Sequence, residues 1–172
     1  MRRWTVSLRA IPGIPVDRAK LRTTAAYAFD EDLQVGVEWN PLGEDIGPIA
    51  NWRALDETEN RPALIFGTSS DRIGTPHGRA VYATLSKDLE AWTHLPIAPY
   101  AGVSYGTFDE ELVPIGGLLV RWAEHFSTTH LYDGDNLHHI ATWTFDSGVS
   151  IGAIAVDQDG KYYFGASVAA GF

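Results

Sequence analysis

Residues 161–172, with the sequence KYYFGASVAAGF, decide the fold of this chain. Counting back from residue 172, every second position is apolar or aromatic, and the positions between them are mostly small or polar. The first set comprises Tyr162, Phe164, Ala166, Val168, Ala170 and Phe172. Because side chains alternate between the two faces of a β-strand, this stretch predicts a strand with one continuous apolar face.

The same two-residue period recurs along the rest of the chain, with turn residues between the runs. The runs cover residues 3–10, 21–29, 33–40, 61–70, 78–86, 95–108, 111–122, 125–134, 136–145 and 149–156, and a weaker run covers 48–55. No helix of normal length is indicated. We expect an all-β fold, an antiparallel up-and-down meander of about twelve strands in a single domain spanning residues 1–172.

Composition excludes several classes of function. The 172 residues are 45% hydrophobic and 20% charged, so the chain is not expected to be disordered. A formal net charge of −9 argues against nucleic acid as a partner, and the absence of cysteine removes disulfides and thiol catalysis. The N-terminal segment is not a convincing signal peptide, because Arg9, Pro12 and Pro15 interrupt its apolar residues.

A strand that ends on phenylalanine, with apolar residues at alternate positions before it, resembles the closing strand of bacterial outer-membrane β-barrels. The resemblance is to that broad class and to no particular family. It implies a closed transmembrane barrel in the bacterial outer membrane with membrane lipid as its partner. The implied membrane-insertion signal is the apolar set Phe164, Val168, Ala170 and Phe172.

Two patterns favour a membrane barrel over a soluble one. The alternate positions of many runs carry Gly, Ala, Ser and Thr rather than the Lys and Glu of a solvated face. Aromatic residues also gather near the ends of runs, where membrane barrels carry aromatic girdles. The alternative is a soluble β-barrel or sandwich, with the apolar face inward, that acts as a binding module for a small ligand or a protein.

In a membrane barrel, the charges on the polar faces point into the lumen, where they must pair with one another or line water. The candidates for lumen-facing residues are Arg3, Arg9, Arg22, Glu38, Arg53 and Arg121. These charges would either plug the barrel or tune a narrow pore.

Other polar clusters have ordinary structural explanations. His138 and His139 are adjacent and would face opposite ways, which leaves only a pairing of one of them with His130 as a metal site. The sequences DGDN (133–136) and DQDG (157–160) match hairpin turns better than calcium loops. Residues 67–78 bring serines, Asp71 and His77 close in sequence but lack a nucleophile elbow.

These patterns together predict a non-enzymatic outer-membrane β-barrel without a metal or cofactor. It would serve as a membrane anchor, as a subunit of an envelope assembly with other envelope proteins, or as a narrow passive pore.

Overall fold

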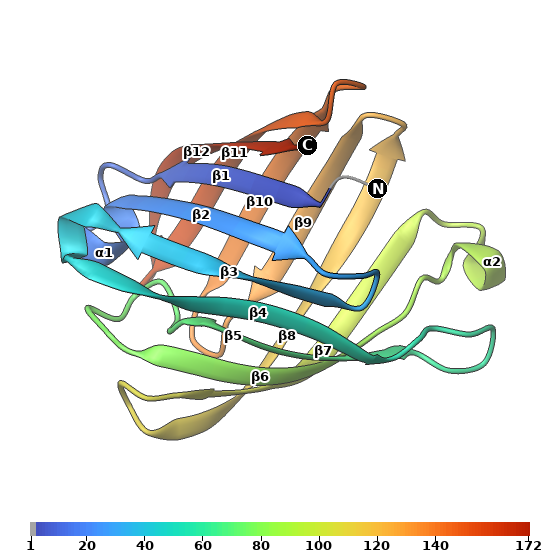
Figure 1. Cartoon of the computed structure of the whole chain (residues 1–172), viewed down its shortest axis with the longest axis horizontal. Helices are drawn as coiled ribbons and strands as arrows, with labels where there is room; N and C mark the ends of the chain where they lie inside the picture. Colours follow the sequence, from blue (N-terminus) through green and yellow to red (C-terminus); the bar gives the residue numbers. More distant parts are fainter. Residues whose placement is uncertain (1–2) are drawn as a thin grey trace.

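The computed structural model describes residues 3–172 and shows twelve antiparallel strands that close into a barrel. Each strand pairs with its neighbours in sequence, and β1 pairs with β12 to close the wall (Figure 1). The strands are β1 (Trp4–Ala10), β2 (Leu21–Ala28), β3 (Leu33–Asn40), β4 (Asp45–Leu55), β5 (Ala63–Ser70), β6 (Arg79–Ser86), β7 (Ile97–Gly106), β8 (Glu111–Ala123), β9 (Phe126–Tyr132), β10 (Leu137–Thr144), β11 (Val149–Gln158) and β12 (Lys161–Gly171). The all-β meander predicted from the two-residue period is therefore confirmed.

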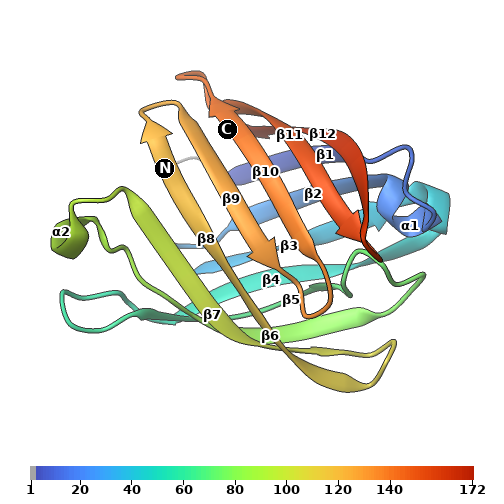
Figure 2. The same cartoon turned by 180° about the vertical axis from the view of Figure 1, so that it is seen from behind.

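The barrel has two different ends. Both termini lie at one end, here called the mouth, together with the connections 29–32, 56–62 and 87–96 (Figures 1 and 2). The longest of these contains the short helix α2 (Glu90–Thr93). The opposite end carries the connection 11–20 with the short helix α1 (Asp17–Lys20). No helix within residues 3–172 is long and apolar enough to cross a membrane.

The distribution of side chains is the reverse of that in a water-soluble domain. The buried polar set is as large as the buried hydrophobic set, which consists only of Ala, Ile and Val. The buried polar residues are Arg18, Glu38, Asn40, Asp71, Thr75, Thr84, His138 and Gln158. Meanwhile the large apolar side chains of the strands lie on the outer wall, with Val37 48% exposed, Val81 57% and Phe164 71%. The alternation therefore places most large apolar residues outward, while the inward positions are mainly polar or small, with apolar exceptions such as Ile154 and Val156 near the end with α1.

Aromatic side chains ring the outer wall at both ends. All six tryptophans are exposed, from 44% for Trp143 to 64% for Trp122. Following the strand directions, Trp39 lies at the end with α1 and the other five lie at the mouth. The end with α1 also carries Tyr105, Tyr132 and Tyr162, which are exposed.

The connection 11–20, here called the cap, folds into its end of the barrel. Ile11, Ile14 and Ala19 of the cap are buried against Ile154 and Val156, which point inward from β11. This cluster is the only apolar core that residues 3–172 form. The cap supplies three of its five members, so it packs inside this end of the barrel against β11.

Small inward residues make room for large polar neighbours in the lumen. Gly67 on β5 is the register partner of Tyr82 on β6, and a Cβ at Gly67 would overlap the Tyr82 ring. Gly117 on β8 stands opposite Tyr100 on β7 in the same way. The glycines on the polar faces are thus required by close packing inside a narrow barrel.

Two prolines lie where the wall is paired on one side only. Residues 45–49 of β4 pair with β3 but have no partner on β5, and Pro48 falls in this segment. Residues 111–115 of β8 likewise lack a partner on β9, and Pro114 falls there. Proline has no N–H to donate to a ladder, so the unpaired edges accommodate it. The connection between β3 and β4 is correspondingly short, because β4 already begins at Asp45.

Candidate functional site: the charged interior of the barrel

The structure separates the six predicted lumen residues into three groups. Arg9, Arg22 and Glu38 lie inside the barrel near the cap. Arg53 and Arg121 lie at the mouth and are paired with carboxylates. Arg3 is exposed and donates to the hydroxyl of the outward-facing Tyr27, so its side chain lies at the rim and not in the lumen.

Glu38 is the centre of the interior charge network. Its carboxylate is completely buried and is paired with the guanidinium of Arg22. Asn40 donates to it at 3.0 Å, and Arg79 lies 3.6 Å away. Arg79 in turn donates to Asp45 at 2.9 Å. One buried carboxylate therefore serves two arginines, which ties β2, β3 and β6 together.

Arg18 was not predicted as an interior residue, because it lies in a connection with no strand pattern. Its guanidinium donates to the backbone oxygens of Asp71, Arg72 and Thr75 and to the Thr75 hydroxyl, at 2.7–3.1 Å. Burial lowers the pKa of Arg18, and the charges of Asp45 and Glu38 oppose this effect. The Arg18 guanidinium therefore joins the cap to the β5–β6 connection. All of its hydrogen-bond partners are neutral oxygens, and no carboxylate contacts it among the described residues.

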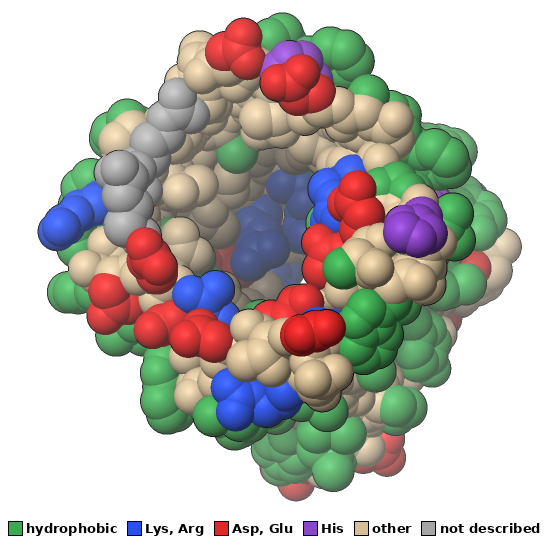
Figure 3. All heavy atoms as spheres, turned by 90° about the vertical axis from the view of Figure 1, so that its right-hand side faces the viewer, with side chains coloured by type: hydrophobic (Ala, Val, Ile, Leu, Met, Phe, Trp, Pro, Cys, Tyr) green, Lys and Arg blue, Asp and Glu red, His purple; other side chains and the backbone are tan. Residues whose placement is uncertain are grey.

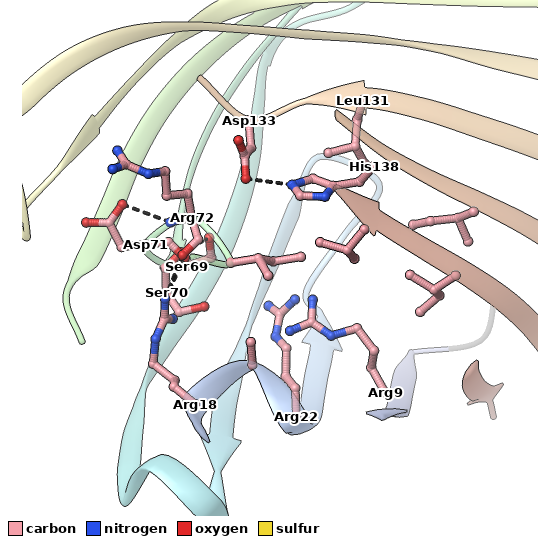
Figure 4. Close-up of a pocket in the computed structure, with 15 residues that line it drawn as sticks. Arg9, Arg18, Arg22, Ser69, Ser70, Asp71, Arg72, Leu131, Asp133 and His138 are labelled. Atoms are coloured by element: carbon pink, nitrogen blue, oxygen red, sulfur yellow. Dashed lines mark hydrogen bonds and ion pairs between the residues drawn. The ribbon is translucent and has the colours of Figure 1, made fainter. Parts of the chain in front are cut away.

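A cavity of about 290 Å³ lies between the cap and the inward faces of the strands. Arg9 and Arg22 extend their guanidinium groups into it side by side, and His138 and Asp133 lie on the opposite wall (Figure 4). The remaining wall is largely apolar and includes Ile73, Leu131, Ile140, Ile154 and Val156. The cavity thus combines a cationic side with an apolar one.

His138 and Asp133 form the second buried polar pair of this region. His138 is 2% exposed, and its Nε2 lies 2.6 Å from Oδ2 of Asp133. A carboxylate only accepts hydrogen bonds, so Nε2 of His138 carries a proton. Burial alone would raise the pKa of Asp133, but the His138 hydrogen bond and the backbone N–H of Asn136 outweigh it and hold that pKa below its ordinary value of 3.8.

Replacing Asp133 with Asn is expected to destabilise the barrel by about 1–3 kcal/mol at neutral pH, because a charge-assisted hydrogen bond to a buried histidine is lost. The folded-state pKa of Asp133 is lowered, so its stabilisation is present above pH 3.8 and is lost as the pH falls further. Urea midpoints of wild type and variant should therefore converge as the pH falls below 3.8. Asp135→Asn, which changes an exposed residue of the same turn, is the control. If the loss of stability caused by Asp133→Asn did not depend on pH, the stabilising role of the ionised Asp133 would be contradicted.

The mouth carries many charges that are paired locally. Arg53 contacts Asp32 and Asp56, and Arg121 contacts Asp88 and Glu90, which lie in the β6–β7 connection. Viewed from this end, acidic and basic side chains ring a hollow, and Lys or Arg side chains are visible at its floor (Figure 3). Basic side chains therefore lie at the floor of an opening that leads to solvent.

The other polar residues singled out in the sequence are dispersed. His138 points inward, whereas His139 and His130 meet on the outer wall with their Nδ1 atoms 2.8 Å apart. Within residues 3–172 no three His, Asp or Glu side chains are arranged to hold a metal ion. The DGDN and DQDG segments form hairpin turns, with Gly134 and Asp159 at positive φ.

The serine-rich segment is not built as a nucleophile and base. The Ser69 hydroxyl donates to the carbonyl of Ser70, and Asp71 accepts from backbone N–H groups of Arg72 and Phe108. His77 is exposed and packs edge-on against Phe108. Among the described residues, no contact joins these hydroxyls to that imidazole.

The predicted membrane-insertion set lies along the outward face of β12. Phe164 and Phe172 are 71% and 67% exposed, and Val168 is 41% exposed. Ala170 shares this face and pairs with Val6 of β1 and Val149 of β11. The backbone of Phe172 exchanges two hydrogen bonds with Trp4, so this residue belongs to the closing seam of the barrel.

No protein-family model matches this chain, and a search of curated proteins finds no match.

Proposed function

We propose that this chain is a non-enzymatic, integral outer-membrane β-barrel that acts as a membrane anchor or as a subunit of an envelope assembly. One observation carries the proposal: the strands expose large apolar side chains and bury charged ones. In water such a surface would be costly, since contiguous exposed apolar area drives association. In a bilayer the same surface is solvated by lipid, and the polar lumen is expected.

The position of the aromatic residues supports the same environment. Tryptophan and tyrosine favour the boundary between lipid and water, and here they ring the outer wall at both ends. The alternative, a soluble barrel that binds a ligand inside, would bury these rings. The apolar core of residues 3–172 instead holds five fully or nearly fully buried Ala, Ile and Val residues around the cap.

The cap favours an anchor or assembly role over an open pore. It packs apolar side chains inside one end of the lumen, and Arg18 fastens it to the β5–β6 connection. The cap therefore narrows the lumen at this end. We therefore expect little or no single-channel conductance from the barrel in planar bilayers.

Refolding with and without a mild detergent tests the proposal. The chain is expected to be insoluble in plain buffer and to refold in detergent into a β-rich species. That species should migrate differently on SDS gels before and after boiling, because a closed membrane barrel resists SDS until it is heated. A folded monomer that stays soluble in plain buffer would overturn the membrane assignment and favour the soluble binding module.

A further inference from the structure

We propose that the cavity beside the cap is a binding site for a small oxyanion, a carboxylate or a phosphate, held by Arg9 and Arg22. The first observation is their register. Arg9 on β1 and Arg22 on β2 are direct pairing partners and both point into the lumen. Like charges directly opposite on two strands destabilise a sheet, so a negative charge is required between or beside them.

The protein supplies only part of that charge. Glu38 pairs with Arg22, and Arg79 also approaches the same carboxylate. Arg9 makes no ion pair within residues 3–172. Arg18, which also lines the cavity, is held by neutral oxygens. Asp71 and Asp133 also line the cavity, but among the described residues neither forms an ion pair with Arg9 or Arg22, so Glu38 is the one carboxylate in contact with this arginine pair.

The hydrogen-bond inventory points to the same missing group. The Nε atoms of both Arg9 and Arg22 are buried and lack a hydrogen-bond partner. Buried donors without partners are rare, and each is costly. A guanidinium offers a planar fork of donors that matches the oxygens of a carboxylate or phosphate. An oxyanion would satisfy both arginines at once.

The size and access of the cavity fit a small ligand. Its volume of about 290 Å³ lies at the lower limit of small-molecule pockets. Basic side chains are visible at the floor of the hollow seen from the mouth (Figure 3). The apolar wall formed by Ile140, Ile154 and Val156 would accommodate a short hydrocarbon portion. We therefore expect the ligand to enter from the mouth and to place its charged group against Arg9 and Arg22.

Titration calorimetry of the folded barrel tests this site with inorganic phosphate and with butanoate, at an ionic strength held constant with sodium chloride. Saturable binding of either anion supports the proposal. The anion that binds with the higher affinity shows whether the site prefers a phosphate or a carboxylate group. Replacing Arg9 with Gln should weaken binding about ten-fold or more, because a charge-assisted contact is lost. Arg53→Gln, which alters a paired arginine at the mouth, should leave binding unchanged.

Two outcomes would overturn the proposal. One is that neither phosphate nor butanoate releases or absorbs more heat than a control titration with sodium chloride. The other is that Arg9→Gln binds the anion as tightly as wild type. If Arg9→Gln does not fold, Arg9→Lys keeps the charge and removes the planar fork, and weaker binding is expected there too. The measurement is made in whichever medium holds the folded barrel, detergent or buffer. Its result is therefore independent of the membrane assignment.

Discussion

Replacing Glu38 with Gln is expected to destabilise the barrel by about 3–5 kcal/mol, because breaking a buried ion pair leaves an uncompensated charge in the interior. Glu38 is fully buried and is the shared partner of Arg22 and Arg79. The glutamine keeps the volume and one hydrogen-bond acceptor for Asn40, so the loss reports mainly the charge. Urea midpoints of the refolded wild type and variant, converted with a common slope, measure the effect.

Asp32→Asn is the matched control for Glu38→Gln. Asp32 also pairs with an inward-pointing arginine, Arg53, but its side chain is 48% exposed at the mouth. Solvent screens such a pair, and its loss is expected to cost about 1 kcal/mol or less. Equal losses in the two variants would show that the interior is as well solvated as the mouth, and the buried network would then have no special role.

Replacing Val37 with Arg is expected to destabilise the barrel by about 2–4 kcal/mol when it is folded in lipid bilayers, since an arginine near the bilayer midplane must be taken out of water. Val37 lies mid-strand on β3, points outward and is 48% exposed. Folding titrations in vesicles at increasing urea concentration measure the difference from wild type.

An arginine introduced near a strand end distinguishes the effect of depth in the bilayer from a general effect of adding a charge to the outer wall. Leu112 is 66% exposed on the outward face near the start of β8. Leu112→Arg is expected to cost about 1 kcal/mol or less, because an arginine near the interface reaches water. If Val37→Arg is as mild as Leu112→Arg in vesicles, the outer wall does not face lipid at that depth.

The sequence predicted the strands and their faces because both depend on a local, two-residue period. The period placed Arg9, Arg22 and Glu38 on the polar faces of their strands, and the small residues and aromatic positions that favour a membrane barrel predicted that these faces point inward. Their mutual arrangement did not follow from these patterns, because the pairing of Arg9 with Arg22 depends on strand register, which is set by contacts between strands. The sequence therefore predicted charges in the lumen and left their geometry open.

The residues that sequence reasoning missed lie in connections or at the first residue of a strand. Arg18 is in a connection, and its partners Asp71, Arg72 and Thr75 are in another connection far along the chain. Arg79 begins its strand and reaches Asp45 in a segment where β4 and β5 are unpaired. Arg3 was predicted inward by alternation, but at the first residue before β1 its long side chain turns outward to Tyr27.

The pairing of glycines with tyrosines in the lumen restricts the register in which neighbouring strands can pair. The outer wall is apolar over most of its length, so sliding one strand past its neighbour by two residues would change little there. Inside, the same slide would drive the Tyr82 ring against a residue that has a side chain, instead of against Gly67. Gly117 and Tyr100 impose the same requirement on β7 and β8. The packing of the interior therefore selects one register for strands whose outer surfaces would tolerate several.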